Sequence, residues 1–498
     1  MSSSPQKIQP GLPSGFRDYL PREMIVRNQM LQTIREVYER FGFDPLETPG
    51  MERRAVLTGG QDASMMIYET RTSADRAPAD ATDPRATALR FDLTVPLARV
   101  VAQYLGVGTA QDRQLRLPFR RYQMGSVWRG ERPQAGRFRE FIQCDADIVG
   151  VATPVADAEV IALAVTALQA LGVPRFAVRF NNRKLLNALA PYAGFDPARI
   201  ADVLRVLDKY LKIGRDGVLR ELTKPQRPAQ AAATEGEADT ESDFGLGFDA
   251  ATAARIAAFM DLSGSTDELL ERSAALFAGV ALAEEGIAEL RSIVDALRAM
   301  GADERCWRLD LTIARGLGYY TGMVFETFLL DERGEMLVMP SADSADGQQE
   351  ERFGSVCSGG RYDGLVSRFS DASIPATGAS IGVDRLFYQL VRTGVITPTP
   401  TRVQALVTVM DPEHIADYLA ITGQLRAAGI RTVLWEGAET SFKEQLSYAV
   451  AQEIPFVLIV GDDERASGTV AVKHMAAHTQ TAIPRPDIVQ HLLRHCEE

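Results

Sequence analysis

The feature that most limits how this chain can fold is a pair of strand-like segments, within residues 115–150, that enclose a polar loop. The loop, WRGERPQAGRFREF, carries four arginines in a short stretch: Arg129, Arg132, Arg137 and Arg139. Arginines held between strands can clamp a phosphate through paired hydrogen bonds, and the loop glycines let the backbone approach a ligand. A solvated basic hairpin is the alternative interpretation of the same residues.

The chain is too long, at 498 residues, for one ordinary hydrophobic core. We expect a core in two parts, residues 1–183 and 304–396, separated by a helical insertion over residues 184–303 that is rich in Ala and Leu. From residue 402 to 498, strand-like and helical segments alternate, which predicts a small α/β domain with a largely parallel sheet. The polar stretch 72–88 predicts a mobile loop, and the acidic stretch 226–246 predicts disorder.

Cysteine and histidine usage excludes several classes of chemistry. The four cysteines include no CxxC pair, so neither a zinc site nor a disulfide framework is expected. All five histidines lie in the last fifth of the chain, which excludes serine-hydrolase triads and histidine-ligated metals from the first 400 residues. With no long apolar run and no secretory signal, we expect a cytoplasmic protein without a membrane span. The net charge of −12 decides little, because nucleic-acid binding depends on local charge.

Three later segments add candidate binding residues. IARGLGYYTGMVFET (313–327) places Arg315 before a glycine and two adjacent tyrosines, Tyr319 and Tyr320, whose phenols can hydrogen-bond a ligand. A strand with aromatic packing would look the same. GSVCSGGRYDGLV (354–366) contains a glycine pair that permits a close backbone turn beside a ligand, or an ordinary hairpin. IPATGASIGVDRLFYQL (374–390) carries Arg385 near a helix start, where an arginine can stack on adenine or bind phosphate, or be an unremarkable helix-start residue.

Two short segments offer acceptors for a small cationic ligand. LRFDLT (89–94) contains Asp92 and Thr94, and QCDAD (143–147) contains Gln143 and Asp147. An ammonium group needs acceptors, and a selective imidazole site needs a carboxylate or phenol partner. As isolated residues, such aspartates more often lie on the surface or cap helices.

Taken together, these segments resemble the histidyl-tRNA synthetase family, a branch of the class II aminoacyl-tRNA synthetases. The order R-x-E-R-P-Q-x-G-R-x-R-E-F resembles motif 2, the segments 313–327 and 354–366 resemble two histidyl signatures, and 374–390 resembles motif 3. The opening GLPSGFRDYLP with the helix predicted over 21–41 resembles the family's N-terminus and dimer element, and the last hundred residues resemble its anticodon-binding domain.

The resemblance implies an α+β catalytic core, built as an antiparallel sheet with helices, followed by a C-terminal α/β anticodon-binding domain. It implies ATP-dependent ligation of L-histidine to the 3′ end of tRNA(His) through histidyl-adenylate, with AMP and pyrophosphate released. It further implies a homodimer, Mg²⁺ that arrives with ATP, and no metal held by protein His or Cys.

The resemblance also assigns roles to residues. It makes Arg129 and Arg315 catalytic, at the α-phosphate. It assigns histidine binding to Asp92, Leu93, Thr94, Arg129, Gln143, Asp147, Arg315, Tyr319 and Tyr320. It assigns ATP binding to Arg129, Glu131, Arg137, Arg315 and Arg385, and tRNA contact to Arg132 and Gln134. The chain departs from the family at Gly318, where an acidic residue is common, and has Asp rather than the frequent Glu at 92 and 147.

The closest alternative is the regulatory subunit of ATP phosphoribosyltransferase, a binding protein with a similar core. That class usually lacks the C-terminal domain and the signature arginines, whereas Arg129, Arg315 and Arg385 are all present here. Another class II synthetase would share motifs 2 and 3 but would not be expected to carry RGLGYYTG. A non-enzymatic nucleic-acid-binding module would not need an amino-acid pocket.

Overall fold

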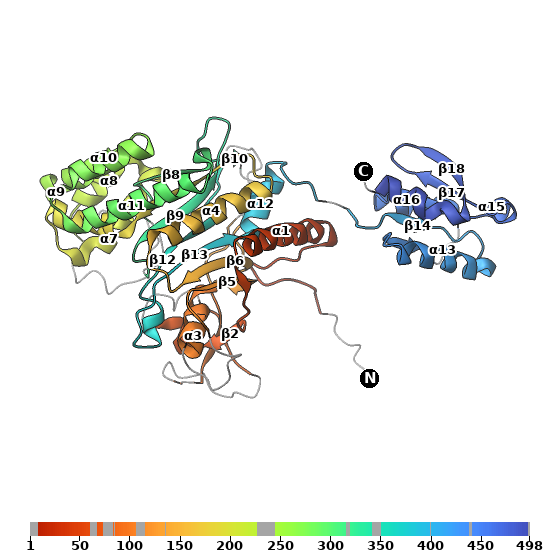
Figure 1. Ribbon diagram of the computed structural model, residues 1–498, viewed down its shortest axis with the longest axis horizontal. Coiled ribbons are helices and arrows are strands. Elements are labelled where there is room, and N and C mark those ends of the chain that lie inside the picture. The colour runs from red at the N-terminus through yellow and green to blue at the C-terminus, as the bar shows by residue number, and fades with distance from the viewer. Residues whose placement is uncertain are drawn as a thin grey trace, which may run out of the picture. The chain divides into compact units, whose positions relative to one another are not determined.

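The computed structural model describes most of the chain (Figure 1). The described residues are 8–59, 67–72, 83, 85–105, 115–134, 136–226, 245–314, 319–340, 350–398, 400–437 and 441–496. The chain groups into two compact units, one of residues 1–17 and 30–395 and one of residues 18–29 and 396–498. The stretches for which we expected a mobile loop (72–88) and disorder (226–246) fall largely outside the described residues.

A large, mainly antiparallel sheet forms the centre of the first unit. Its strands are β1 (Asp44–Pro45), β5 (Phe119–Trp128), β6 (Glu140–Val149), β7 (Phe176–Asn182), β8 (Trp307–Leu309), β9 (Met323–Leu329), β12 (Cys357–Arg361) and β13 (Ala376–Gly382). The strand order is β1-β5-β6-β13-β12-β9-β7-β8, and the parallel pairs lie at its two ends. The five pairs between them are antiparallel. The antiparallel core that the family resemblance implied is confirmed.

Successive residues of a strand point to opposite faces of its sheet, and polar residues gather on one face of this sheet. On β6, Gln143, Asp145 and Asp147 share a face. The register places these three opposite Gly125, Gln123 and Arg121 on β5, and opposite Gly382, Ser380 and Gly378 on β13. On the β13 side these polar groups therefore face only glycines and a serine, which leaves room above the middle of the sheet.

The other face is covered by helices, as Figure 1 shows for α4 (Pro154–Ala170) and α12 (Val383–Arg392). Helix α4 contacts β6, β7, β12 and β13, and its Ala- and Val-rich sequence is buried almost throughout. Helix α1 (Pro21–Arg40) reaches the sheet through Tyr38, whose hydroxyl donates to the Cys144 carbonyl at 2.9 Å. This helical layer supports the polar face from behind.

In the described part of the segment between β7 and β8, where we predicted a helical insertion, the structure contains seven α-helices. They are α5 (Arg183–Asn187), α6 (Leu189–Ala193), α7 (Ile200–Leu207), α8 (Tyr210–Thr223), α9 (Ala250–Met260), α10 (Thr266–Leu276) and α11 (Ala281–Ala299). Polar side chains define where they begin: Asp249 caps α9, and Ser265 with Glu268 forms a capping box on α10. Helix α11 packs on both α4 and α5, and it thereby joins the insertion to the helical layer behind the sheet.

The remaining described elements of this unit are short. They are β2 (Met51–Arg53), α2 (Arg54–Thr58), β3 (Glu69–Thr70), β4 (Thr87–Leu89), α3 (Thr94–Tyr104), β10 (Val338–Pro340) and β11 (Glu350–Arg352). Strands β2, β4 and β3 form a small sheet of their own, and α3 begins directly after the LRFDLT segment.

The second unit is an α/β fold with a mixed sheet. It contains β14 (Ala405–Val407), α13 (Ile415–Ala427), β15 (Thr432–Leu434), α14 (Phe442–Ala451), β16 (Phe456–Ile459), α15 (Asp462–Ser467), β17 (Thr469–His474), β18 (Thr479–Pro484) and α16 (Ile488–Cys496). Strands β15, β14 and β16 are parallel, as the alternating pattern predicted. The largely parallel sheet that we predicted is wrong for β17 and β18, which pair antiparallel. Only four residues separate these two strands, too few for a parallel crossover.

No helix among the described residues is both long and apolar enough to cross a membrane.

Candidate active site

A cavity of about 330 Å³ opens on the polar face of the large sheet. Its walls come from the loop between β5 and β6 and from β6, β9, β12, β13 and the start of α12. The lining residues are Arg129, Glu131, Gly136, Arg137, Phe138, Phe141, Gln143, Tyr320, Phe325, Glu326, Ser355, Val356, Cys357, Ser358, Gly359, Ser380, Gly382 and Arg385. Segments more than 250 residues apart in the sequence thus meet at one site.

Three arginines form what we call the arginine side of the cavity: Arg129, Arg137 and Arg385. Arg129 follows the last residue of β5, and its Nε donates to the Phe91 carbonyl at 3.0 Å. Its guanidinium lies over the Phe141 ring, 5.2 Å from the ring centroid. The side chain is therefore oriented by a carbonyl and a ring rather than by a carboxylate.

The other two guanidinium groups converge near Gly354. A Cβ placed on Gly354 would lie 3.4 Å from Arg385 Nη1 and 3.5 Å from Arg137 Nη2. Arg385 Nη1 also donates to the Ser355 carbonyl at 2.8 Å. Arg137 is fixed through its backbone, which exchanges hydrogen bonds with Gln134 across the loop. Three half-buried cations on one wall make a site suited to a polyanion such as a phosphate chain.

Three buried aspartates form a second group, the acidic cluster: Asp92, Asp145 and Asp147. Among the described residues, its one ion pair joins Asp147 Oδ2 to Nη2 of the fully buried Arg121 at 2.8 Å. The Tyr362 hydroxyl donates to the other oxygen of Asp147, and Arg121 Nη2 donates to the Leu93 carbonyl at 3.0 Å. The charge of Arg121 also acts against the rise that burial causes in the pKa values of Asp92 and Asp145, and the charge of Arg129 does so for Asp92.

Burial raises the pKa values of these carboxyl groups. Burial is the main cause for all three, raising the pKa of Asp92 to about 6 and that of Asp145 to about 7. The pKa of Asp147 is also raised by burial, although Arg121 and the hydroxyl of Tyr362 act against that rise. An additional positive charge beside this cluster would be stabilised, because it would favour the ionised carboxylates.

Three buried acceptor oxygens near this cluster have no hydrogen-bond partner among the described residues: Asp92 Oδ2, Gln143 Oε1 and Asp145 Oδ1. The rest of each side chain is engaged. Asp92 Oδ1 accepts from the Val95 amide at 3.1 Å, and Gln143 Nε2 donates to Ser380 Oγ at 2.7 Å. A hydrogen bond from the Ser380 hydroxyl acts against the rise in the pKa of Asp145. Buried acceptors without donors are costly, so this arrangement suits a ligand that supplies several N–H groups.

The structure brings six of the predicted site residues to the cavity wall: Arg129, Glu131, Arg137, Gln143, Tyr320 and Arg385. Asp92, Leu93, Asp147 and Tyr319 do not line it and lie behind it, where Tyr319 packs on Tyr320 with ring centroids 5.0 Å apart. Thr94 is the first residue of α3. Arg132 and Gln134 are exposed on the loop and do not line the cavity. Arg315 and Gly318 lie outside the described residues.

Asp145, Ser380 and Glu326 were not predicted from the sequence. The alternation of QCDAD was a usable signal for Asp145, because residues 143, 145 and 147 of one strand must share a face. Ser380 and Glu326 gave no comparable signal, since only the pairing of β6 with β13 and of β9 with β12 brings them to the site.

The antiparallel sheet with arginines from a hairpin loop and from a helix start, together with the separate α/β unit, defines a class II aminoacyl-tRNA synthetase. Family models agree, because the histidyl-tRNA synthetase model matches residues 15–386 and the anticodon-binding-domain model matches residues 404–495. The chain belongs to the histidyl-tRNA synthetase family.

Individual relatives give the same result over nearly the whole chain. A histidine–tRNA ligase of Paracoccus denitrificans is 39% identical over 523 residues, covering 98% of this chain and 99% of the relative. The histidyl-tRNA synthetase structure from Nostoc superposes with a TM-score of 0.78 at 31% identity, covering 98% of this chain and all of that one. A Bacillus halodurans structure described as an ATP phosphoribosyltransferase regulatory subunit/histidyl-tRNA synthetase has a TM-score of 0.64 at 22% identity, over 89% of this chain and 97% of that one. At that identity the likeness concerns the fold alone.

Proposed function

We propose that this chain ligates L-histidine to the 3′ end of its tRNA in two steps, using ATP and releasing AMP and pyrophosphate. In the first step, a carboxylate oxygen of histidine attacks the α-phosphorus of ATP, the bond to the bridging oxygen breaks, and pyrophosphate leaves. In the second step, a terminal ribose hydroxyl of the tRNA attacks the acyl carbon of histidyl-adenylate, and AMP leaves. The observation that carries the proposal is one cavity with three arginines on its wall and three buried carboxylates behind it.

The arginine side suits the nucleotide. Adenylyl transfer needs reactants to be positioned and phosphate charge to be neutralised, and it needs no protein nucleophile. Arg129 is the proposed catalytic residue at the α-phosphate and at the carboxylate of histidine, with Arg315 as its counterpart. Arg137 and Arg385, which converge near Gly354, would hold the remaining phosphates or the adenine.

The acidic cluster suits the amino acid. The unpartnered acceptors of Asp92 and Gln143, with the hydroxyl of Thr94, would receive the α-ammonium group of histidine. The imidazole would be read by Tyr320, which lines the cavity, and by Asp147, which Arg121 and Tyr362 hold in place. We assign the Leu93 backbone and Tyr319 to the same pocket.

The residues present also fit Mg²⁺ bound with the nucleotide. The carboxylates of Glu131 and Glu326 both line the cavity, and Mg²⁺ commonly binds through one or two carboxylates together with substrate phosphates. When bound there, the ion would neutralise phosphate charge. The charge of Glu131 would in turn limit how close the pyrophosphate can approach without a cation.

The tRNA contacts fall in two places. We propose that the exposed loop residues Arg132 and Gln134 meet the acceptor end, and that residues 402–498 bind the anticodon. We further propose a catalytic core of residues 1–183 and 304–396, an insertion domain of residues 184–303, a homodimer, and a cytoplasmic location.

The test is amino-acid-dependent ATP–pyrophosphate exchange, run with each of the twenty amino acids. Exchange with histidine alone is the expected result, and Arg315→Ala should abolish it while leaving the oligomeric state unchanged. Histidine binding without any exchange would favour a regulatory binding protein instead. Exchange with a different amino acid would contradict the assigned pocket.

A further inference from the structure

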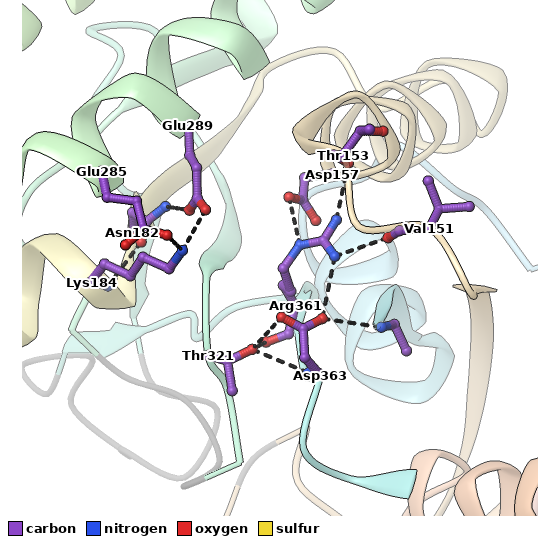
Figure 2. A network of polar contacts seen from close by, with 11 residues as sticks. Val151, Thr153, Asp157, Asn182, Lys184, Glu285, Glu289, Thr321, Arg361 and Asp363 are labelled. Atoms are coloured by element: carbon purple, nitrogen blue, oxygen red, sulfur yellow. Dashed lines mark hydrogen bonds and ion pairs between the residues drawn. The ribbon is translucent and has the colours of Figure 1, made fainter. Parts of the chain in front are cut away.

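The residue that follows the two tyrosines, Thr321, is held on one side by the end of β12 (Figure 2). Its amide donates to the Arg361 carbonyl at 2.8 Å. Its hydroxyl donates to Asp363 Oδ2 at 3.1 Å and accepts from the Asp363 amide at 3.1 Å. The backbone that carries Tyr320 is therefore tied by three hydrogen bonds to two residues of the GGRYDG segment.

Those two residues are themselves firmly anchored. The Arg361 side chain is 5% exposed, and its Nε donates to Asp157 Oδ2 at 2.9 Å. Its Nη1 and Nη2 donate to the Val151 and Thr153 carbonyls at 3.0 and 3.1 Å, at the start of α4. Figure 2 shows this guanidinium between Asp157 and the two carbonyls. A buried arginine with this many partners is a rigid base for the contacts above it.

Asp363 links the two ends of this arrangement. Its Oδ1 accepts from the Ala376 amide at 3.2 Å and from Arg361 Nη1 at 3.3 Å, while Oδ2 receives the Thr321 hydroxyl. Removing the carboxylate would release Thr321 and leave both the Ala376 amide and Arg361 without one acceptor.

Close packing leaves the tyrosine little freedom. A Cβ on Gly360 would lie 3.0 Å from Tyr320 Cδ1 and 2.4 Å from the Met323 carbonyl oxygen. A Cβ on Gly322 would lie 2.9 Å from Arg361 Cδ. The Tyr320 ring thus rests against one glycine of β12, and the turn after it rests against the arginine stem.

A second anchor holds the same turn from the helical insertion. The Arg183 amide donates to the Gly322 carbonyl at 2.8 Å. Its two neighbours bind α11: Asn182 Nδ2 donates to Glu289 Oε2 at 2.7 Å, and Lys184 Nζ donates to Glu289 Oε1 at 2.6 Å. Figure 2 shows this Asn182–Lys184 group beside the Arg361 group, with Thr321 in the latter.

We propose that Thr321 and Asp363 are positioning residues for histidine, which fix the backbone that carries Tyr320 and thereby set the affinity for the amino acid. This inference rests on the proposed function. It separates the two substrates, because the arginines of the nucleotide side are fixed elsewhere. Arg129 donates to the Phe91 carbonyl, Arg385 donates to the Ser355 carbonyl, and Arg137 is held through the loop backbone.

The test compares KM values in ATP–pyrophosphate exchange. Thr321→Val keeps the shape and removes the hydroxyl, so we expect the KM for histidine to rise about five-fold, while Asp363→Ala should raise it by at least about ten-fold. The KM for ATP should stay within about two-fold in both. Thr321→Ser, which keeps the hydroxyl, should restore the wild-type KM, and the inhibition constant of L-histidinol should rise by the same factor as the KM for histidine.

Thr252→Val is the matched control. Thr252 Oγ1 donates to Asp249 Oδ2 at 3.0 Å at the start of α9, so this variant loses the same type of Thr–Asp hydrogen bond. Neither residue lines the cavity. Thr252→Val should lower the melting temperature without changing either KM.

An unchanged KM for histidine in Thr321→Val, or an equal rise in the KM for ATP, would overturn the positioning role. If Thr321→Val fails to fold, Asp363→Asn, which keeps the side-chain shape and one acceptor, decides by the same comparison. Wild-type protein that exchanges with histidine while these variants show no shift would leave the proposed function intact and remove only this inference. Wild-type protein without exchange would overturn both.

Discussion

The arginine side and the acidic cluster are adjacent, yet they present their charges in opposite ways. Arg129, Arg137 and Arg385 are half-buried at the cavity wall, and the first and last are oriented by carbonyl groups. The aspartates of the acidic cluster are each 2% exposed and lie behind the wall, with one ion pair among them in the described structure.

This difference fits what each side is proposed to bind. A guanidinium stays charged at any physiological pH, so it can wait at the surface for a phosphate. A carboxylate that must distinguish a cationic amino acid gains from burial, because a low-dielectric environment strengthens its interaction with a bound ammonium. The cost appears as raised pKa values, which an arriving cation reverses.

The largest effect should come from removing Arg129, which is proposed to contact both the α-phosphate of ATP and the carboxylate of histidine. Arg129→Ala should lower kcat/KM for ATP–pyrophosphate exchange by on the order of 10³-fold, because it removes one of the two guanidinium groups proposed to stabilise charge at the α-phosphate. Steady-state exchange measures this. The melting temperatures of the wild type and of Arg129→Ala serve as the folding control. A loss of kcat/KM below about ten-fold would contradict the catalytic role.

The acidic cluster is tested by Asp92→Asn. Asn keeps the Oδ1 acceptor that receives the Val95 amide at 3.1 Å, but it replaces the unpartnered oxygen with a donor and removes the charge. The KM for histidine should rise by about 30- to 100-fold, with the KM for ATP nearly unchanged. Asp249→Asn is the control, because Asp249 Oδ1 likewise accepts from the amide three residues on, that of Thr252, at 2.9 Å. This variant should leave both KM values at wild type.

The sequence predicts the arginine side better than it predicts the acidic cluster. The arginine loop is local, so its residues and its position between two strands follow from residues 115–150. The acidic cluster is assembled across strands: Arg121, Asp147 and Tyr362 meet only through the register of β5, β6 and β13 and the segment after β12. A sequence pattern fixes the face on which a residue lies, but not its cross-strand partner.

The second unit teaches the same lesson. Alternating strands and helices predicted the parallel strands β14, β15 and β16. The antiparallel β17 and β18 were missed because short strands joined by a tight turn were grouped with the alternating pattern.

A smaller effect concerns how the stability of the folded protein depends on pH through Asp145. Burial raises the pKa of Asp145 to about 7 in the folded protein, above its value in the unfolded chain. The group therefore favours the folded state at low pH, and this contribution is lost as the pH rises through about 7. Without histidine, the wild-type melting temperature should fall between about pH 4 and pH 8 relative to that of Asp145→Asn, by about 2–5 °C. Thermal unfolding across that range measures the difference, and parallel curves for the two proteins would contradict a buried, raised carboxyl.

The smallest expected effect marks where the arginine side ends. Arg132 belongs to the same loop as Arg129 and Arg137 but is exposed and does not line the cavity. Arg132→Ala should therefore leave ATP–pyrophosphate exchange within about two-fold of wild type, because Arg132 is exposed and has no proposed role in adenylate formation. Its removal should raise the KM for tRNA in aminoacylation by about three-fold, the effect of losing one exposed phosphate contact, and this increase should shrink as salt is raised. A large loss of exchange in this variant would instead extend the arginine side beyond the cavity wall, to a loop that closes over the nucleotide.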